Sequence, residues 1–344
     1  MNKMTPLQRV LTTLGHKEPD RVPLFLLLTM HGAKELGMSL QEYFSSGENV
    51  AEGQVRLRTK YEHDCYYPFF YAAVEVEAWG GGVIYQPDGP PNAGAPIIRD
   101  MADILKLDPP GIKGNPPLAK VLKSIEILKA RGEEVPIVGV VMSPFSLPIM
   151  QMGFEPYLQL MHEHQDLFQR LMDINEDFIV SWANAQLDAG ATAITYFDPV
   201  ASPSMVPRET YLKTGFKVAQ RTLAKINGPT AVHVASGRAL PIIDDIVQLE
   251  TAIVGTSTLE NLSDLKDACK GRLTVLGNLN GIEMCRWTKQ ETVSAVRSAI
   301  EKAGPGGGFI LADNHGEIPF QVTDETLMTI VETVRTYGKY PLDA

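Results

Sequence analysis

Short apolar segments alternate with longer amphipathic ones along most of this chain of 344 residues. The short segments are rich in β-branched residues, which favours strands, and the longer ones have the apolar spacing of helices. This alternation is typical of a parallel α/β fold, because parallel strands need a crossover element between them. Strands are predicted over Val22–Leu28, Cys65–Tyr71, Pro136–Met142, Thr192–Phe197, Thr230–Val234, Ala252–Val254, Leu273–Leu276 and Gly308–Ala312.

The first helix signal lies at the start of the chain. Thr5 followed by Pro6 is typical of a helix start, and Gly15 follows the last apolar position. Residues 1–20 are therefore predicted to form an N-terminal helical extension. Further helices are predicted over Leu240–Leu249, Leu259–Cys269 and 289–303, the last opened by the capping box from Thr288 to Glu291.

Eight strands in this rhythm predict one domain over residues 1–344, a (β/α)8 TIM barrel with the N-terminal helical extension, and residues 80–96 as decoration. A doubly wound open sheet is the alternative, but no GxGxxG motif follows the first strand. The run Gly304–Gly308 precedes a strand and lacks the ending of a phosphate loop, so it is predicted to be a tight turn.

Charge and composition narrow the class of protein. Lys and Arg number 31 against 41 Asp and Glu, a net charge of −10, which argues against a nucleic-acid or anionic-membrane surface. Apolar runs fall far short of the ~20 residues of a membrane span, and the start of the chain does not resemble a signal peptide. The three cysteines are widely spaced and form no CxxC motif. A cytoplasmic protein is expected.

Polar residues follow four of the predicted strands. Asp198 ends one strand, and Ser202 lies in its loop. His233 lies near the end of the next strand, Asn278 follows another, and His315 follows the last. Because a barrel gathers its chemistry at the carboxyl ends of its strands, these side chains are expected to meet at one mouth. The structural alternatives are a hydrogen-bonded core histidine at position 233 and ordinary turn or loop roles for the others.

A second group of candidates lies among aromatic residues. Tyr66 and Tyr67 belong to an aromatic stretch that Glu75 follows. Such a stretch is suited to lining the pocket of a flat organic substrate. The alternative is a buried aromatic cluster whose neighbouring carboxylates are solvated.

Several segments resemble the uroporphyrinogen decarboxylase superfamily. The sequence 228–237, GPTAVHVASG, resembles the segment that holds a zinc His-x-Cys motif in its methyltransferase branch, which includes the methylcobalamin:coenzyme M methyltransferases. The segments Lys17–Pro23, Asp188–Ala191, Gly277–Leu279 and Pro305–Pro319 agree with the same superfamily. The similarity covers nearly the whole chain and implies the barrel fold.

Departures from the family pattern indicate the branch. The decarboxylases carry arginines after the first strand to hold the propionates of their substrate, whereas Phe25–Gly32 has none and contains His31. Compared with the methyltransferase branch, this chain has Ala235 at the position of the second zinc ligand of the His-x-Cys motif. His315 occupies the position of a downstream cysteine. If the strand continued through residue 235, the side chains of residues 233 and 235 would lie on the same face of it.

The resemblance implies a corrinoid-dependent methyltransferase that moves a methyl group between a small methylated compound and a corrinoid protein, which carries the cobalamin. Replacing both thiolates by His and carboxylate would give a harder Zn²⁺ site, suited to an O-methyl donor. Glu75 or Asp198 would complete it beside His233 and His315. If the metal has been lost, the two histidines would instead act as proton donors.

Two other functions stay open: a decarboxylase of the same family, and a non-catalytic barrel that docks a corrinoid protein. A homodimer is also left open. The candidate catalytic residues are His233, His315 and Asp198; the candidate substrate-binding residues are Asn278, Tyr66, Tyr67, His31 and Ser202; the candidate metal ligands are His233, His315 and Glu75.

Overall fold

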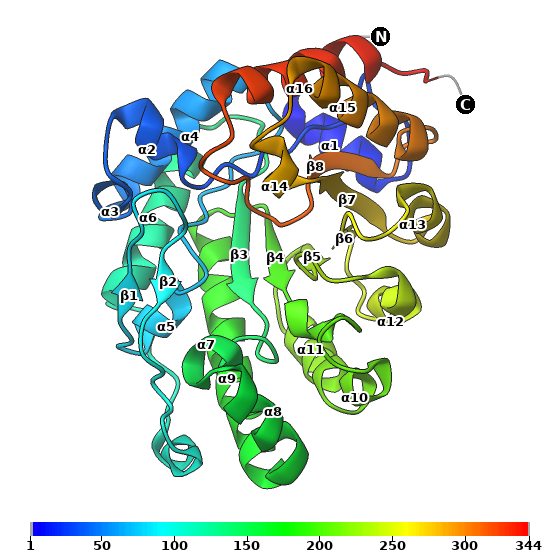
Figure 1. Ribbon diagram of the computed structural model, residues 1–344. Helices are drawn as coiled ribbons and strands as arrows, with labels where there is room; N and C mark the ends of the chain where they lie inside the picture. The colour runs from blue at the N-terminus through cyan, green and yellow to red at the C-terminus, as the bar shows by residue number, and fades with distance from the viewer. Residues whose placement is uncertain (1–2, 343–344) are drawn as a thin grey trace.

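The computed structural model describes residues 3–342, and a parallel six-stranded sheet lies at its centre (Figure 1). The strands are neighbours in chain order, and each crossover between them contains helix. Six predicted strands are thereby confirmed, with bounds within three residues of those expected. The strands are Val138–Met142 (β3), Ala193–Phe197 (β4), Thr230–His233 (β5), Ile253–Gly255 (β6), Thr274–Leu279 (β7) and Phe309–Asp313 (β8).

The prediction of regular strands is wrong for the other two segments. Within Val22–Leu28, Leu24 makes a single parallel bridge to Leu311 of β8. Within Cys65–Tyr71, Tyr66 makes a single parallel bridge to Ile137, just before β3. Each segment contains a proline, which has no N–H to donate to a ladder.

These two extended segments nevertheless lie between the first and last strands of the sheet. The Phe25 N–H donates to the Leu311 carbonyl (2.9 Å), and the Tyr66 N–H donates to the carbonyl of Pro136 (2.7 Å). The segments also meet each other, because the Asp64 N–H donates to the Leu24 carbonyl (2.8 Å). A continuous path of backbone hydrogen bonds therefore runs from β8 back to β3.

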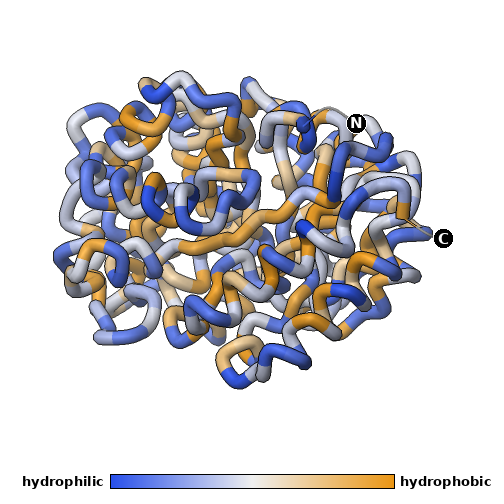
Figure 2. Tube along the Cα trace, turned by 90° about the horizontal axis from the view of Figure 1, so that it is seen from above, coloured by the Kyte–Doolittle hydropathy of each residue, from blue (hydrophilic) through white to orange (hydrophobic). Residues whose placement is uncertain are grey.

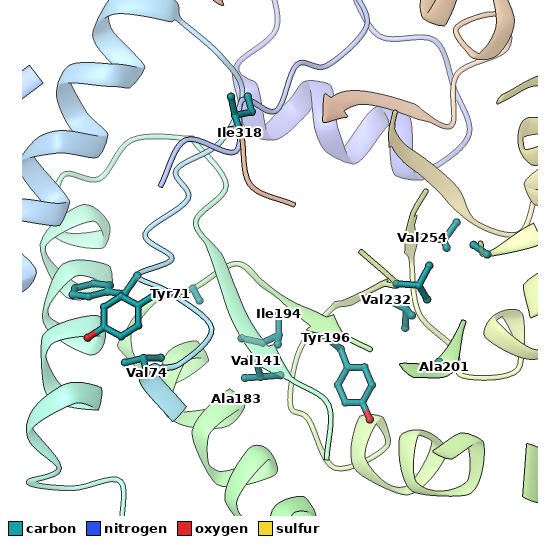
Figure 3. Packing of buried hydrophobic residues seen from close by; sticks show 14 of the residues in the cluster. Tyr71, Val74, Val141, Ala183, Ile194, Tyr196, Ala201, Val232, Val254 and Ile318 are labelled. Atoms are coloured by element: carbon teal, nitrogen blue, oxygen red, sulfur yellow. The ribbon is translucent and has the colours of Figure 1, made fainter. Parts of the chain in front are cut away.

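Side chains on the two faces of the sheet pack into separate clusters, because successive strand residues point to opposite faces. Seen from above, hydrophobic stretches run through the interior, with hydrophilic residues on the surrounding segments (Figure 2). One face packs against helices and includes Val141, Ile194, Tyr196, Val232 and Val254 (Figure 3). The inner face forms a smaller cluster of Val10, Phe25, Leu27, Cys65, Tyr67, Val138, Val140, Phe197, Leu276, Ile310 and Ala312.

Most helices lie around the outer face of the sheet (Figure 1). Those before β3 are Pro6–Leu14 (α1), His31–Leu36 (α2), Leu40–Tyr43 (α3), Gly47–Tyr61 (α4), Val74–Ala78 (α5), the 3₁₀ turn Met101–Lys106 (η1) and Pro116–Ala130 (α6). Those after β3 are Pro148–Met152 (α7), Phe154–Glu163 (α8), Gln165–Ala189 (α9), Pro199–Ala201 (η2), Arg208–Lys213 (α10), Gly215–Leu223 (α11), Leu240–Ile242 (η3), Ile243–Val247 (α12), Leu262–Cys269 (α13), Gly281–Met284 (α14), Lys289–Ala303 (α15) and Asp324–Tyr337 (α16). No helix within residues 3–342 is long and apolar enough to cross a bilayer.

The helix predictions hold with two adjustments. The capping boxes at Thr5 and Thr288 open α1 and α15 as expected. The helix predicted over 240–249 is instead a 3₁₀ turn followed by α12, because Ile242 has φ −121° and ψ 15°, outside the helical region. The helix predicted from Leu259 starts at Leu262, where the Asn261 side chain accepts the Ser263 N–H.

Helix α1 covers the amino ends of the strands. Its leucines, with the inner faces of β3, β4 and β5, line an apolar cavity of about 90 Å³. Arg9 of α1 forms ion pairs with Asp20 (2.6 Å) and Asp64 (2.7 Å), and Arg21 also pairs with Asp64 (2.6 Å). The start of the chain also meets its end, because the Val22 N–H donates to the Gly338 carbonyl (2.8 Å).

The decoration predicted at 80–96 is an antiparallel hairpin of Val83–Ile84 (β1) and Asn92–Ala93 (β2). Its turn reaches the segment after β8, where the Gln321 side chain donates to the Asp88 carbonyl (2.7 Å). This contact places the hairpin beside the carboxyl end of the sheet.

Candidate active site

His233 is the last residue of β5, and its side chain faces inward. It is buried and stacks on Phe197 at the end of β4, with 4.7 Å between ring centroids. Nδ1 accepts the Ala235 N–H (2.9 Å), which places the imidazole hydrogen on Nε2, an atom without a partner among the described residues. Burial, with a smaller contribution from His315, lowers the pKa of His233 to about 3. His233 is therefore a neutral, buried N–H donor.

Ala235 does not share a strand face with His233. β5 ends at His233, and Ala235 adopts the left-handed conformation with φ 50°. The chain turns there, because the Ala235 N–H bonds back to the imidazole and the Gly237 N–H bonds to the Val234 carbonyl (2.9 Å). The expectation of a shared face is wrong for this reason.

His315 lies in the loop after β8 and is partly exposed. Nδ1 of its ring makes a hydrogen bond with the hydroxyl of Ser236, in the loop after β5. Asp313 fixes the backbone of this loop, because its Oδ2 accepts the N–H groups of His315 (2.8 Å), Gly316 (2.9 Å) and Glu317 (3.2 Å). Burial raises the pKa of Asp313, and these N–H groups oppose the rise.

Asn278 is connected to His315 through two serines. Its side-chain amide donates to the Ser257 carbonyl (2.9 Å), and the Ser257 hydroxyl donates to the Ser236 carbonyl (2.8 Å). The Ser236 hydroxyl completes the chain to His315. The loops after β5, β6 and β8 are thereby held together with the end of β7.

Glu317 is a site residue that the sequence reasoning did not assign. Its Oε1 accepts a hydrogen bond from the Thr29 hydroxyl, at the end of the extended segment that lies beside β8. Burial raises the pKa of Glu317 to about 7, with a smaller contribution from Asp313. The available signal was its place two residues after His315, in the same loop.

His315 and Glu317 open onto a cavity of about 430 Å³ at the carboxyl ends of the strands. Its walls come from the segment before α2, the hairpin turn, α14 and the segment after β8: Met30, Asp88, Gly89, Pro90, Ile282, His315, Glu317, Pro319, Phe320 and Gln321. These residues include two carboxylates and no Lys or Arg. Tyr67, a predicted substrate-binding residue, holds this loop from below, because its hydroxyl donates to the Gly316 carbonyl (2.9 Å).

Asp198 turns away from this cavity. Its Oδ1 accepts the hydroxyls of Ser143 (2.7 Å) and Ser146 (2.6 Å), in the loop after β3. Burial raises the pKa of Asp198 to about 6, and the two hydroxyls oppose the rise. The inner face at the end of β4 belongs to Phe197, so the next residue faces the outer layer.

Four other predicted site residues make structural contacts away from the cavity lining. The Ser202 hydroxyl donates to the Arg238 carbonyl (3.0 Å) and so supports the loop that carries Ser236. The Tyr66 hydroxyl donates to Glu133 (2.7 Å). Buried His31 lies 3.4 Å from the Val322 carbonyl and contacts the edge of Phe320, which places it behind the cavity wall. Glu75 is buried behind β3, where Oε1 accepts the Met142 N–H (3.0 Å).

These positions do not fit the expected zinc ion. Among residues 3–342, no three His, Cys, Asp or Glu side chains are grouped closely enough to hold a metal. Glu75 is held by the backbone of β3, and Nδ1 of His315 is engaged by Ser236. The predicted ligand set of His233, His315 and Glu75 is therefore not assembled.

The chain resembles known proteins along most of its length. A methylcobamide:CoM methyltransferase of Methanosarcina barkeri is 28% identical over 55% of this chain, a match that spans 58% of that relative. A methylcobamide:CoM methyltransferase of Methanosarcina acetivorans is 23% identical over 98% of this chain and 99% of its own. A uroporphyrinogen decarboxylase of Bacillus subtilis is 27% identical over 77% of this chain and 72% of its own.

A structural comparison and a family model point in the same direction as these relatives. The solved structure of a methyltransferase from Methanosarcina mazei superposes with a TM-score of 0.81, covering 97% of this chain and 99% of that one, at 20% identity. At that identity the likeness shows the fold. The uroporphyrinogen decarboxylase (URO-D) family model matches residues 5–337. The chain therefore belongs to the uroporphyrinogen decarboxylase family.

Proposed function

We propose that this protein is a corrinoid-dependent methyltransferase that moves a methyl group between a small methylated compound and a corrinoid protein. Relatives named as methylcobamide:CoM methyltransferases support this reaction class, one of them along nearly the full chain. The proposal includes a closed barrel of one domain, in which the segments around Leu24 and Tyr66 complete the wall between β8 and β3. It also includes a cytoplasmic location.

The lining of the cavity at the carboxyl ends of the strands carries the proposal. A tetrapyrrole with several propionates needs cationic side chains, whereas this cavity presents Glu317 and Asp88 and no Lys or Arg. Its volume of about 430 Å³ lies at the small end of ligand pockets. A small methylated compound therefore fits the cavity better than a porphyrinogen, which argues against the decarboxylase alternative.

The residues at the cavity have distinct roles in this proposal. His315, oriented by Ser236, contacts the methyl donor and supplies a hydrogen bond to its leaving group. Glu317 faces the same space and binds the donor. His233 does not line this cavity but the smaller apolar cavity that α1 also lines, and its Nε2–H has no partner among the described residues. Asn278, Ser257 and Ser236 position the loops.

The corrinoid belongs to the partner protein in this proposal. When the methyl group moves to the corrinoid, the corrinoid supplies the electron pair that attacks it. In the opposite direction the corrinoid supplies the methyl group. The residues of this chain bind and orient the small compound and shield it from water. The proposed reaction has no zinc-dependent step, because the predicted ligands are not brought together. The main reason to expect an O-methyl donor was such a zinc site, so that expectation is not kept. Pairing of two copies rests on the resemblance alone.

The test is methyl transfer to chemically reduced cobalamin, a surrogate for the partner protein. The purified chain is incubated with reduced cobalamin and a panel of methylated compounds, and methylation is followed by absorbance. Activity that is lost in His315→Ala but retained in His162→Ala, an exposed control in α8, supports the proposal. Decarboxylation of uroporphyrinogen would overturn it, and so would binding of a methylated compound without any turnover when a corrinoid protein is also supplied.

A further inference from the structure

The charge of the cavity wall is one-sided. Glu317 comes from the loop after β8 and Asp88 from the hairpin turn, and the Gln321 side chain holds that turn in place by donating to the Asp88 carbonyl (2.7 Å). Among residues 3–342, no Lys or Arg lines the cavity. The whole chain carries a net charge of −10, so the long-range field has the same sign. An anionic ligand would meet repulsion here, and a cation would meet attraction.

The rest of the wall is apolar. Met30, Ile282 and Phe320 contribute side chains to the cavity, with Gly89 and Pro90 of the hairpin turn beside them. Methyl groups on a positively charged nitrogen or sulfur have an apolar surface but share the positive charge. Proteins bind such groups with the faces of aromatic rings and with carboxylates. Walls of this composition suit such a group.

We propose that this cavity binds a small methylated cation, a quaternary ammonium or sulfonium compound, as the methyl donor. The inference rests on the proposed function and adds the charge class of the substrate. The positive centre lies toward Glu317 and Asp88, and the methyl groups contact Met30, Ile282 and Phe320.

The chemistry of such a donor balances without a proton. The bond from the methyl carbon to nitrogen or sulfur breaks, and its electron pair returns to the heteroatom, which leaves as a neutral amine or sulfide. The acceptor, a reduced corrinoid on the partner protein, supplies the electron pair of the new bond to carbon. Glu317 and Asp88 lose one unit of positive charge from their neighbourhood, which favours release of the neutral product.

One lysine close to the cavity provides a matched control. Lys34 is exposed, with Nζ 4.2 Å from the centroid of the Phe320 ring, and its ammonium donates to the Phe320 carbonyl. It does not line the cavity. If the donor were an anion, Lys34 would be a cation close enough to the cavity wall to receive it. Lys34→Gln therefore separates the two charge classes.

The experiment measures binding by calorimetry with two probes of nearly equal shape, choline and dimethylbutanol, in which carbon replaces the charged nitrogen. The pH is held well above 7, because burial raises the pKa of Glu317 to about 7 and its carboxyl must be ionised. We expect choline to bind about tenfold more tightly than dimethylbutanol. Glu317→Gln should remove most of this preference and Asp88→Asn a smaller part, whereas Lys34→Gln, which removes a positive charge beside Phe320, should not reduce it. Circular dichroism confirms that each variant is folded, and Asp88→Asn, in an exposed turn, supplies the answer if Glu317→Gln fails to fold.

Equal affinity for the two probes would overturn the inference, and so would binding of methoxyacetate that Lys34→Gln abolishes. Methyl transfer from choline or trimethylsulfonium to reduced cobalamin is measured in parallel with transfer from methoxybenzoate. If methoxybenzoate is demethylated while choline neither binds nor reacts, the proposed function stands and the cation inference fails. If choline binds selectively but no donor reacts, the cation site stands and the proposed function fails.

Discussion

The Ser236 hydroxyl hydrogen-bonds to Nδ1 of His315, although 79 residues separate the two along the chain. One residue follows β5 and the other follows β8, so the bond joins loops whose strands are separated by β6 and β7 in the sheet. Ser257, after β6, holds the backbone of Ser236 in turn. The orientation of the partly exposed imidazole therefore depends on three loops rather than one.

Ser236→Ala should lower kcat by about tenfold and leave KM nearly unchanged, because the imidazole loses its orienting partner while the cavity keeps its lining. Steady-state kinetics on the preferred donor measure both constants. Ser181→Ala, on the exposed side of α9, is the matched control and should behave as wild type. A change in KM alone would show that Ser236 shapes the cavity instead of orienting His315.

His233→Ala should abolish turnover and leave the protein folded but less stable. The lost ring stacks on Phe197 in the inner layer, so the free energy of unfolding should fall by about 2 kcal/mol. Urea denaturation measures this change. His162→Ala again serves as the control. Wild-type turnover in the folded variant would assign His233 to packing alone.

Glu317→Gln should stabilise the protein at alkaline pH and have little effect in acid. Burial raises the pKa of Glu317 from 4.5 to about 7, with Asp313 adding to the rise and the Thr29 hydroxyl opposing it. The unfolded carboxyl ionises first, so the wild type loses stability as pH rises through this window. Above it, the variant should be more stable by roughly 1–3 kcal/mol. Denaturation at several pH values checks the sign; a constant difference would contradict it.

Asp198→Asn should keep at least about a third of the activity, because an amide oxygen can still accept the Ser143 and Ser146 hydroxyls. Asp198→Ala should lower the free energy of unfolding by about 2 kcal/mol, since both hydroxyls lose their acceptor. Kinetics and urea denaturation of the two variants are compared. An inactive but stable Asp198→Asn would support the catalytic role that the sequence suggests.

The double substitution Ala235→Cys with His315→Cys should not create a tight zinc site. Ala235 has φ 50° and lies beyond the end of β5, so a cysteine there does not point alongside His233. Zinc affinity is measured by competition with a chromogenic chelator, with wild type beside it. A gain of about a hundredfold in zinc affinity would show that the loop rearranges to bring the two thiolates together.

The sequence predicts the regular parts of the fold well, because local patterns determine them. The capping box at Thr5 marks α1, and β-branched runs mark β3 to β8. The segments around Leu24 and Tyr66 are harder, because Pro23 and Pro68 interrupt ladders whose partners lie far away in the chain. Their apolar character is visible in the sequence, but the number of hydrogen bonds they form is not.

The site was predictable only where a residue's position on its strand determines its direction. His233 ends a strand on the inner face, and the pattern places it correctly at the sheet's carboxyl end. Asp198 lies one residue beyond the inward-facing Phe197, so a shift of one position turns it outward. Glu317 gains its raised pKa from burial beside Thr29, 288 residues earlier, and no local pattern reports such a contact.

The meeting of the two chain ends has a consequence for biosynthesis. Helix α1 is made before every strand of the six-stranded sheet, yet Val22, which follows it, finds its hydrogen-bond partner at Gly338, which is made only after β8. During translation the apolar face of this helix, including Val10, therefore lacks much of its final packing surface. A nascent chain that stalls before β8 would keep that face exposed to chaperones, and products that lack β8 would aggregate more readily than a chain that contains it.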